Sequence, residues 1–407
     1  MERHISIDAV RGFAVLGILL MNIVSMGLPG YAYVNPMHYG GHTGADLWAW
    51  GLAHVLVDGK MRALFTMLFG ASMLLIADRA QGQSPGPAAV HYRRIFWLFV
   101  IGMIHCWLIW YGDILVTYAL AGAIVFGARR WSPRRQIIAG IIVLVLLALY
   151  SLAGWFHFSG LQQVAAANGP GAAAARAAPE ELAGAPVSAA QEIAGYRGGF
   201  LDVFRARAPS AIFFQTFLLP TQAIPEAVGL MLVGMGLFRT GFFSGEWPRR
   251  AYRRALWLIP AGIVITLPVT RLLVVSRWDN VTELLGYASA AIAAPLMALG
   301  YAAAIVLIVR SGALAAVVAR LAAVGRMALT NYLGASILAT TFFYGYGLGM
   351  FARLSRAELY LVVLAIWALQ LALSPLWLRR FRYGPFEWLW RSLVRGGAQP
   401  LRGPATA

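Results

Sequence analysis

The sequence predicts an all-α membrane protein, a polytopic bundle of about ten transmembrane helices with both termini in the cytoplasm. Of its 407 residues, 60% are hydrophobic and 12% are charged, whereas a soluble globular domain carries about 25% charged residues. Apolar runs long enough to cross a bilayer recur along the chain. Arginines gather beside these runs, as in "RRWSPRR" and "RRAYRR", which is typical of cytoplasmic loops.

The apolar runs define the predicted spans. The first is interpreted as a retained helix and not as a signal peptide, because Asp8 lies in the would-be positive region and no A-x-A-like site follows. Residues 45–58 are too short and too polar-edged to cross alone, and we expect a helix at the outer surface. The predicted spans are 10–28, 60–78, 95–111, 114–129, 136–157, 211–238, 255–275, 283–309, 327–350 and 357–378.

Charge sets the orientation of these spans. With the N-terminus in the cytoplasm, 23 of the 33 basic residues fall on the inner side, as the positive-inside rule requires. The net charge of +17 is therefore attributed to topology, and no nucleic-acid partner is expected. Cys106 stands alone, so an intramolecular disulfide is excluded, and no metal site is expected.

The composition divides the chain into four parts. Residues 1–157 form a five-span half, 158–210 an extracytoplasmic Ala/Gly/Pro-rich loop, 211–378 a second five-span half, and 379–407 a cytoplasmic Arg/Trp-rich tail. Ser188 and Gln191 have the spacing of a capping box. Ile193, Tyr196, Phe200 and Phe204 recur at helical spacing, which predicts one amphipathic helix on the outer membrane surface. The Trp-containing tail predicts a short helix at the inner headgroup layer.

Two spans carry polar stripes. In the first, Asp8, Arg11 and Asn22 fall within about 60° of one another on an ideal helix. They would line a polar cavity open to the cytoplasm, or form a salt bridge and an interhelical hydrogen bond.

In the sixth span, Gln222 and Glu226 share a face with Gln215, next to two prolines that predict a kink. A carboxylate beside a kink is a common way to build a midplane site. The alternative is a structural kink at which Glu226 pairs with an arginine.

His105 lies deep in the third span and is a candidate general base or transient acyl carrier. The alternative is a hydrogen-bonded structural histidine. On one straight helix, Asp113 would lie about 12 Å from His105 along the axis, so we expect no pairing between them. Asp113 is expected instead to cap the next helix.

Other polar groups lie near the ends of spans. Lys60 and Arg62, beside Asp58, would grip an anionic group at the outer end of the second span. Arg326 and Asn331 lie at the inner end of the ninth span, where Arg326 and Thr330 share a face that would meet a phosphate or a partner helix.

The outer loop after the first span contains His38, His42 and Asp46. They would bind a metal or act as acid and base, or simply belong to a solvated loop. The loop interpretation is preferred.

Several pieces of the chain resemble the YeiB family of uncharacterised bacterial inner-membrane proteins, also described as domain of unknown function 418. They are "IDAVRGFAVLGILLMN", "LFTMLFG", "RRIFWLFVIGMIHCWLIWYGDILVTYALAG", "EAVGLMLVGMGLFRTG", "GRMALTNYLGAS" and "YGPFEWLWRSL". The resemblance extends over nearly the whole chain and implies a multi-pass protein of the bacterial inner membrane. Through the opening Asp8-x-x-Arg11-Gly12, the family is itself similar to membrane acyltransferases of the heparan-glucosaminide acetyltransferase type.

That similarity implies transfer of an acyl group from cytoplasmic acyl-CoA to an extracytoplasmic glycan or lipid acceptor. Under this hypothesis His105 is the base or acyl carrier, and His38 lies nearer to where the lysosomal enzymes keep their histidine. Arg11, Asn22 and Arg326 hold the CoA side, and Glu226 tunes protonation of the cavity. A proton-coupled transporter or flippase, and a non-catalytic scaffold or sensor, are the alternatives. The expected partners are the lipid bilayer and the two substrates. A homodimer is compatible with the sequence, which leaves the oligomeric state open.

Overall fold

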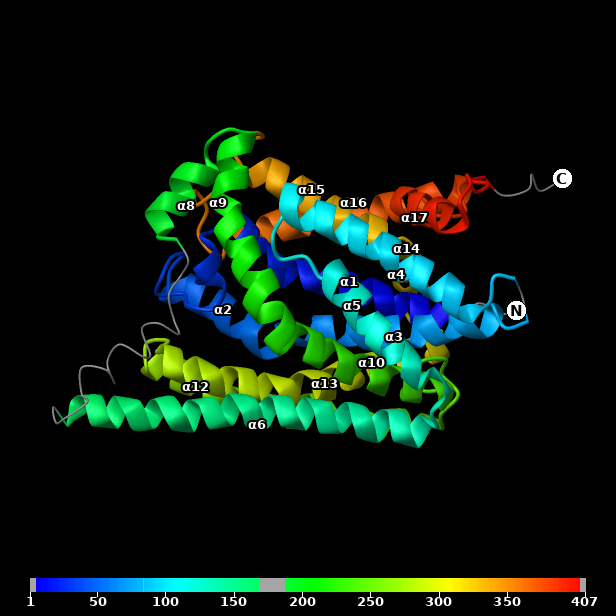
Figure 1. Cartoon of the computed structure of the whole chain (residues 1–407), viewed down its shortest axis with the longest axis horizontal. Coiled ribbons are helices and arrows are strands. Elements are labelled where there is room, and N and C mark those ends of the chain that lie inside the picture. The colour runs from blue at the N-terminus through cyan, green and yellow to red at the C-terminus, as the bar shows by residue number, and fades with distance from the viewer. Residues whose placement is uncertain (1–4, 83, 168–186, 403–407) are drawn as a thin grey trace.

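The computed structural model describes residues 5–82, 84–167 and 187–402, and over these ranges its regular elements are helices, with one isolated bridge between Phe381 and Arg402. Figure 1 shows most of the helices running along the long axis of the molecule. The beginning of α1 (Ile5–Gly27) and the helix α17 (Pro385–Arg395) lie at one end, and α8 (Ala189–Tyr196) lies at the other. This arrangement matches the predicted all-α bundle, with the beginning of α1 and the tail helix α17 on the same side.

Eight helices in the described part of the chain are long and apolar enough to cross a membrane. The other two predicted spans correspond to the shorter helices α5 (Leu115–Val125) and α15 (Ala328–Phe343). The eight are α1, α2 with α3 (Gly44–Arg79), α4 with η2 (Pro87–Ile109), α6 (Pro133–Ala166), α9 to α10 (Phe200–Arg239), α11 with α12 (Arg249–Val275), α13 (Asn280–Ser311) and α16 (Leu359–Arg380).

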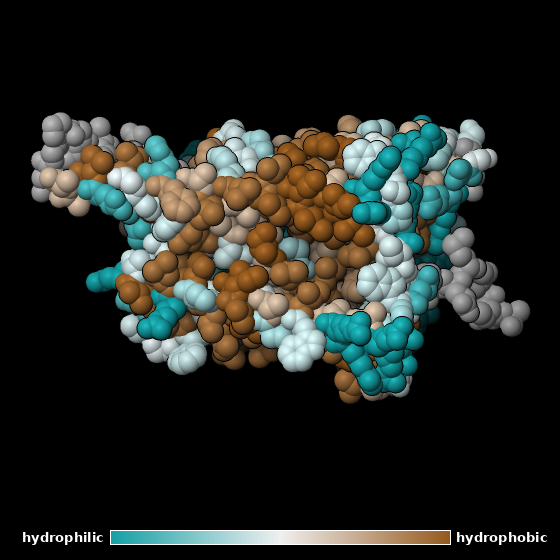
Figure 2. Space-filling model, turned by 90° about the horizontal axis from the view of Figure 1, so that it is seen from below, coloured by the Kyte–Doolittle hydropathy of each residue, from teal (hydrophilic) through white to brown (hydrophobic). Residues whose placement is uncertain are grey.

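The outer surface has the pattern expected of a protein in a bilayer. Figure 2 shows a band of hydrophobic residues across the middle of one face, with hydrophilic groups concentrated at both ends. Helix α6 contributes strongly to the apolar surface, because only 17% of its most apolar window is buried inside the protein. Helices that expose apolar side chains in this way are suited to lipid contact.

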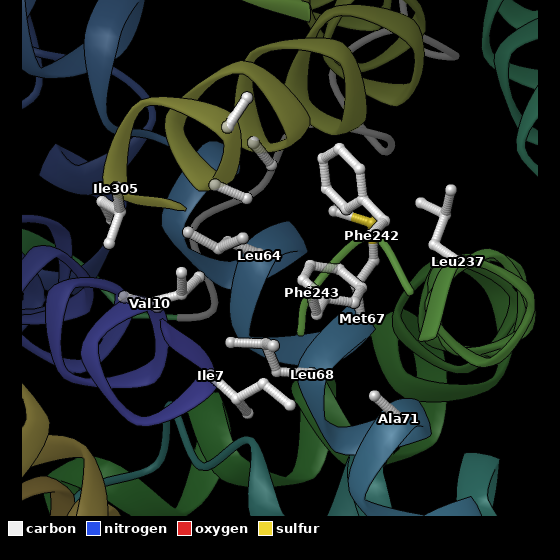
Figure 3. Close-up of a cluster of buried hydrophobic side chains, with 14 of the residues drawn as sticks. Ile7, Val10, Leu64, Met67, Leu68, Ala71, Leu237, Phe242, Phe243 and Ile305 are labelled. Atoms are coloured by element: carbon white, nitrogen blue, oxygen red, sulfur yellow. The ribbon is translucent and has the colours of Figure 1, made fainter. Parts of the chain in front are cut away.

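The core lies where α1 meets α3 (Lys60–Arg79), α10 (Ile224–Arg239) and α13. Val10, Leu64, Met67, Leu237 and Ile305 are among the buried side chains of this cluster. Figure 3 shows these side chains converging from separate helices. Close packing of this kind fixes the mutual positions of the helices that carry the polar residues discussed below.

Helix α14 (Ala315–Arg326) was not predicted, although it packs more intimately on α1 than any predicted neighbour does. A Cβ atom on Gly325 would lie 1.9 Å from the carbonyl oxygen of Asp8, and one on Gly12 would lie 1.9 Å from that of Leu321. Glycines therefore let the two backbones touch, as small residues do at membrane helix interfaces. This contact gives the Asp-x-x-Arg-Gly opening a structural role.

The predicted amphipathic helix over residues 188–204 is wrong in two respects. The capping box of Ser188 and Gln191 does begin a helix, but α8 ends at Tyr196 and a second helix, α9 (Phe200–Phe213), follows after a turn. The predicted apolar face is also only partly exposed, because Tyr196 is buried against Tyr344 and Phe351 whereas Phe200 remains exposed. Gly345 accommodates the turn, since a Cβ there would lie 2.2 Å from the carbonyl oxygens of Arg197 and Gly198.

The predicted boundary at residue 157 falls inside α6, which continues to Ala166. The Ala/Gly/Pro-rich stretch predicted to follow it lies largely at 168–186, outside the described residues. At the other end of the chain the short helix of the tail is present as α17.

Candidate functional site

The helix that carries His105 changes its winding at that residue. Helix α4 (Pro87–Ile104) passes into a π-helical turn, η2 (His105–Ile109), and Trp110 is fully extended at φ −156° and ψ 129°. The backbone N–H of Trp110 donates to the backbone carbonyl of His105 at 2.8 Å, and this hydrogen bond closes the wide turn. π-Turns inside helices occur frequently at functional sites. The consequence here is a sharp reversal of the chain toward α5.

This reversal brings Asp113 back to His105, so the prediction that they do not pair is wrong. Asp113 Oδ1 lies 2.8 Å from His105 Nδ1, and each side chain is 1% exposed. The predicted capping role is confirmed, because Asp113 Oδ2 accepts a hydrogen bond of 2.8 Å from the N–H of Val116 in the first turn of α5. One carboxylate thus orients the imidazole and satisfies a helix terminus.

The second ring nitrogen of His105, Nε2, has no hydrogen-bond partner among the described residues, although it is buried. The ring lies between Trp110, at 6.2 Å between ring centroids, and Tyr332, at 5.2 Å. Tyr332 in turn accepts a hydrogen bond of 3.3 Å from the N–H of Ile114. With Nδ1 held by the carboxylate, Nε2 is the nitrogen that would meet another molecule.

A second ion pair, between Arg62 and Glu226, is only partly buried, because the Arg62 side chain is 42% exposed and that of Glu226 is 15% exposed. Arg62 on α3 donates from Nη2 to both carboxylate oxygens of Glu226 on α10, at 3.1 and 3.2 Å. Glu226 follows η4 (Phe214–Ala223), a π-helical segment that contains Pro220. The wide winding occurs where the sequence predicts a kink. The anionic group that Arg62 holds in this structure is therefore Glu226.

Tyr118 on α5 lies near both pairs. Its hydroxyl lies 2.8 Å from Thr66 Oγ1 and is within electrostatic range of Arg62, Glu226 and Asp113. The buried pair of His105 and Asp113 and the partly buried pair of Arg62 and Glu226 thus both lie in the neighbourhood of Tyr118, without a described contact between the pairs. The remaining predicted site residues lie elsewhere.

At the outer end of α3, Lys60 does not join Arg62. Its Nζ donates to the carbonyl of His54 at 2.7 Å and the side chain is buried. The Asp58 carboxylate accepts from the Tyr33 hydroxyl at 2.8 Å and lies 3.7 Å from the His54 imidazole. These contacts close the outer end of α2 (Gly44–Leu56) onto α3.

The three polar residues predicted to form one stripe on α1 do not share one site in the structure. Arg11 Nη1 lies 3.3 Å from Asp8 Oδ1, which confirms the predicted pairing, and Nη2 donates to Ser72 on α3 at 2.7 Å. Asn22 lies about 16 Å farther along the helix, and its carbonyl accepts a hydrogen bond from the Ser25 hydroxyl. Arg11 is within electrostatic range of Arg94, and Arg94 precedes His105 by three turns of α4, or about 16 Å.

The inner end of α15 is an interhelical junction. Asn331 donates to the carbonyl of Val324 and to Ser374 on α16, each at 3.1 Å. Glu387 on α17 accepts from the N–H of Leu329 and from both donors of Thr330. The partner-helix interpretation of Thr330 is therefore supported. Arg326 ends α14 beside Gly325, at the contact with α1.

Three other predicted polar residues lie apart from these groups. Gln222 is half-buried one turn before Glu226, and Gln215 donates to the sulfur atoms of Met103 and Cys106. In the outer loop, His38 packs edge-on against Tyr31, and burial lowers the pKa of its imidazole. Within the described ranges, no group of three or more His, Cys, Asp or Glu residues is arranged to hold a metal ion.

Three curated relatives match the chain over nearly its whole length. It is 34% identical to "Uncharacterized protein YeiB" of Escherichia coli (strain K12), over 98% of both chains. It is 29% identical to "Uncharacterized protein YxaH" of Bacillus subtilis (strain 168), covering 98% of this chain and 96% of that one.

The third relative is an "Uncharacterized 39.9 kDa protein in amylase 3'region" of Bacillus acidopullulyticus, with 24% identity over 98% of this chain and 96% of that one. The family model described as "Protein of unknown function (DUF418)" matches residues 237–397. The chain belongs to the YeiB family.

The matched family model covers the junction of α14, α15 and α17 but not the His105 and Asp113 pair. The full-length similarity to the YeiB protein of E. coli does include that region. No solved structure matches this YeiB-family chain.

Proposed function

We propose that this YeiB-family protein transfers an acyl group from cytoplasmic acyl-CoA to the hydroxyl of an extracytoplasmic glycan or lipid, with His105 as the general base. The observation that carries the proposal is the buried pair of His105 and Asp113, 2.8 Å apart, with Nε2 unpartnered within the described residues. A carboxylate on Nδ1 fixes the tautomer in which Nε2 is the base, and it stabilises the imidazolium that forms during proton transfer.

The reaction needs one proton to move twice. His105 Nε2 accepts the proton of the acceptor hydroxyl as the oxygen bonds to the thioester carbonyl carbon. The carbon–sulfur bond then breaks, and the imidazolium returns the proton to the sulfur of coenzyme A. Burial of the imidazole at 1% exposure supports this route, because a site without bulk water limits competing hydrolysis of the thioester.

Arginines on the cytoplasmic side would bind the phosphate groups of acyl-CoA. Arg94 lies within electrostatic range of Arg11 and Arg391, and clustered guanidinium groups suit phosphate. The distance of about 16 Å from Arg94 to His105 along α4 would be crossed by the phosphopantetheine arm. Arg326 at the end of α14 and Asn22 farther along α1 remain proposed donor-side residues.

Proton-coupled transport is the alternative, and Glu226 is its natural carrier. The carboxylate is held at both oxygens by Arg62, however, which is always protonated in proteins. A permanent positive charge beside a carboxylate favours its ionised form, which opposes the proton binding that each transport cycle requires. The contact therefore favours a fixed electrostatic role for Glu226 beside Tyr118.

The test is release of free coenzyme A by the purified full-length protein in nanodiscs. Acetyl-CoA and longer acyl-CoA species are supplied with bacterial lipid extract as acceptor, and the thiol is measured colorimetrically. Cys106 is buried, so it adds little background. We expect release by the wild type and by His157→Ala, an exposed-histidine control, and loss in His105→Ala. Absence of binding or turnover of every acyl-CoA would contradict the proposal.

A further inference from the structure

A second group of buried donors lies under α8 and α9, next to the turn that follows His105. Arg207 on α9 is 1% exposed, and its Nη1 donates to the carbonyl of Ile109 at the end of η2. The Nε and Nη2 atoms of the same guanidinium have no hydrogen-bond partner among the described residues. Arg207 is therefore anchored by one nitrogen, with its other donors unused.

Two neighbouring side chains also have unused donors. The Tyr344 hydroxyl and the Trp110 indole N–H are both buried and without a partner in the described parts of the chain. Tyr344 lies within electrostatic range of Arg207, and Trp110 directly follows the residue that anchors the guanidinium. The Tyr196 ring packs against Tyr344 at 4.8 Å and closes this cluster from the side of α8.

The Glu192 carboxylate, which shares neighbours with Arg207, does not neutralise the guanidinium. Glu192 on α8 accepts a hydrogen bond of 2.6 Å from the N–H of Gly30. Among the described residues, no ion pair within 4.0 Å links it to Arg207. A buried guanidinium with one hydrogen bond and no counter-charge is unfavourable, and an anion supplied from outside the chain would satisfy its two free nitrogens.

We infer that Arg207, Tyr344 and Trp110 form a binding site for an oxyanion, the carboxylate or phosphate group of a ligand. The planar fork of a guanidinium matches two oxygens of either group, and the hydroxyl and indole N–H supply the further donors. The Trp110 ring lies edge-on to the His105 ring, with 6.2 Å between the centroids, so the proposed site adjoins the histidine. Identification of the ligand as an acyl acceptor with an anionic group rests on the proposed function, whereas the binding site itself does not.

The test measures thermal unfolding of the full-length protein in detergent, without acyl-CoA. Sodium acetate and inorganic phosphate are titrated separately against sodium chloride at equal ionic strength. We expect one of the two anions to raise the melting temperature of the wild type, and the anion that does so identifies the class of ligand. Arg205→Gln removes an exposed arginine two residues away on the same helix and should leave the shift unchanged.

Two variants remove donors from the site. Arg207→Gln should abolish the shift, and Tyr344→Phe should weaken anion binding roughly tenfold, the loss of one hydrogen bond to a charged group. Tyr344→Phe keeps the ring and removes a hydroxyl that binds no described residue, so it is expected to fold. Equal shifts in wild type and Tyr344→Phe, or no shift with either anion, would overturn the inference and indicate that ordered water satisfies these donors.

Discussion

Gly102 on α4 and Asp113 in the turn before α5 approach so closely that a Cβ on Gly102 would lie 2.9 Å from the Asp113 carboxylate oxygen and 2.8 Å from the Val116 nitrogen. These are the two atoms of the hydrogen bond that joins Asp113 to α5. A glycine is therefore required where the returning chain crosses the helix that carries His105. The geometry of the histidine depends on a residue one turn away from it.

Gly102→Ala is expected to displace Asp113 and to lower the melting temperature, because part of the clash is with backbone that cannot rotate away. The cost should be about 1–3 kcal/mol, the usual range for overpacking. Gly127→Ala is the matched control, since a Cβ there meets nothing within 4 Å. Equal melting temperatures for the two variants would show that the chain reversal at η2 is not as close as described.

Gly325→Ala tests the contact between α1 and α14. The added methyl group would collide with the carbonyl of Asp8 at 1.9 Å, so we expect reduced yield of folded protein and a lower melting temperature. Gly334→Ala on α15, where a Cβ meets nothing within 4 Å, should be neutral or stabilising by up to about 1 kcal/mol through helix propensity. Wild-type stability of Gly325→Ala would argue against this packing.

Glu387→Ala tests how α17 is held. The variant removes the acceptor for two backbone N–H groups and the hydroxyl at the beginning of α15, so α17 should open more often. Hydrogen–deuterium exchange of 385–395 measures this opening and should become faster than in wild type. Glu358→Ala, a change at another glutamate, should leave exchange in that segment unaltered.

Glu192 gives stability a pH dependence. Burial raises its pKa to about 7 from 4.5, against the lowering effect of the hydrogen bond from Gly30. The folded state therefore holds this proton more tightly than the unfolded state. Its contribution to the free energy of unfolding is full below about pH 4.5 and is lost as pH rises through about 7.

The size of this effect is at most about 3 kcal/mol. Thermal unfolding of wild type and Glu192→Gln from pH 5 to pH 8 measures it, and the difference should favour wild type more at the acidic end. Glu358→Gln serves as the control, because hydrogen bonds from Ser355 lower the pKa of that exposed carboxyl and it does not titrate in this range. A pH-independent difference for Glu192→Gln would contradict the assignment.

Most helices could be predicted from the sequence because length and apolar composition decide whether a segment can cross a bilayer. The run from residue 60 to 78 became α3 with one residue's difference at its end. Helix α14 was missed, since its twelve residues are too short for that criterion and its close contact with α1 depends on glycines from both helices. The turn at 197–199 was missed because the aromatic spacing continued across it.

The site was harder to predict than the helices. His105 and Asp113 were both recognised as candidates, but an ideal helix keeps them apart, and no sequence signal indicated the π-turn at 105–109. The partner of Glu226 was expected to be an arginine in one interpretation, yet its identity as Arg62 required the packing of α3 on α10. Arg207 was missed because an arginine in a predicted outer loop is normally solvated. Its burial follows from the unexpected docking of α8 and α9.

The most direct test of the account is the rate of coenzyme A release from acyl-CoA by Asp113→Asn compared with wild type. An amide holds the place of the carboxylate but cannot stabilise the imidazolium, so we predict a loss of about 10²–10⁴-fold with the fold intact. Asp78→Asn, at an exposed aspartate near the end of α3, should retain wild-type rates. Undiminished turnover by Asp113→Asn would contradict the claim that the pair of His105 and Asp113 performs acyl transfer.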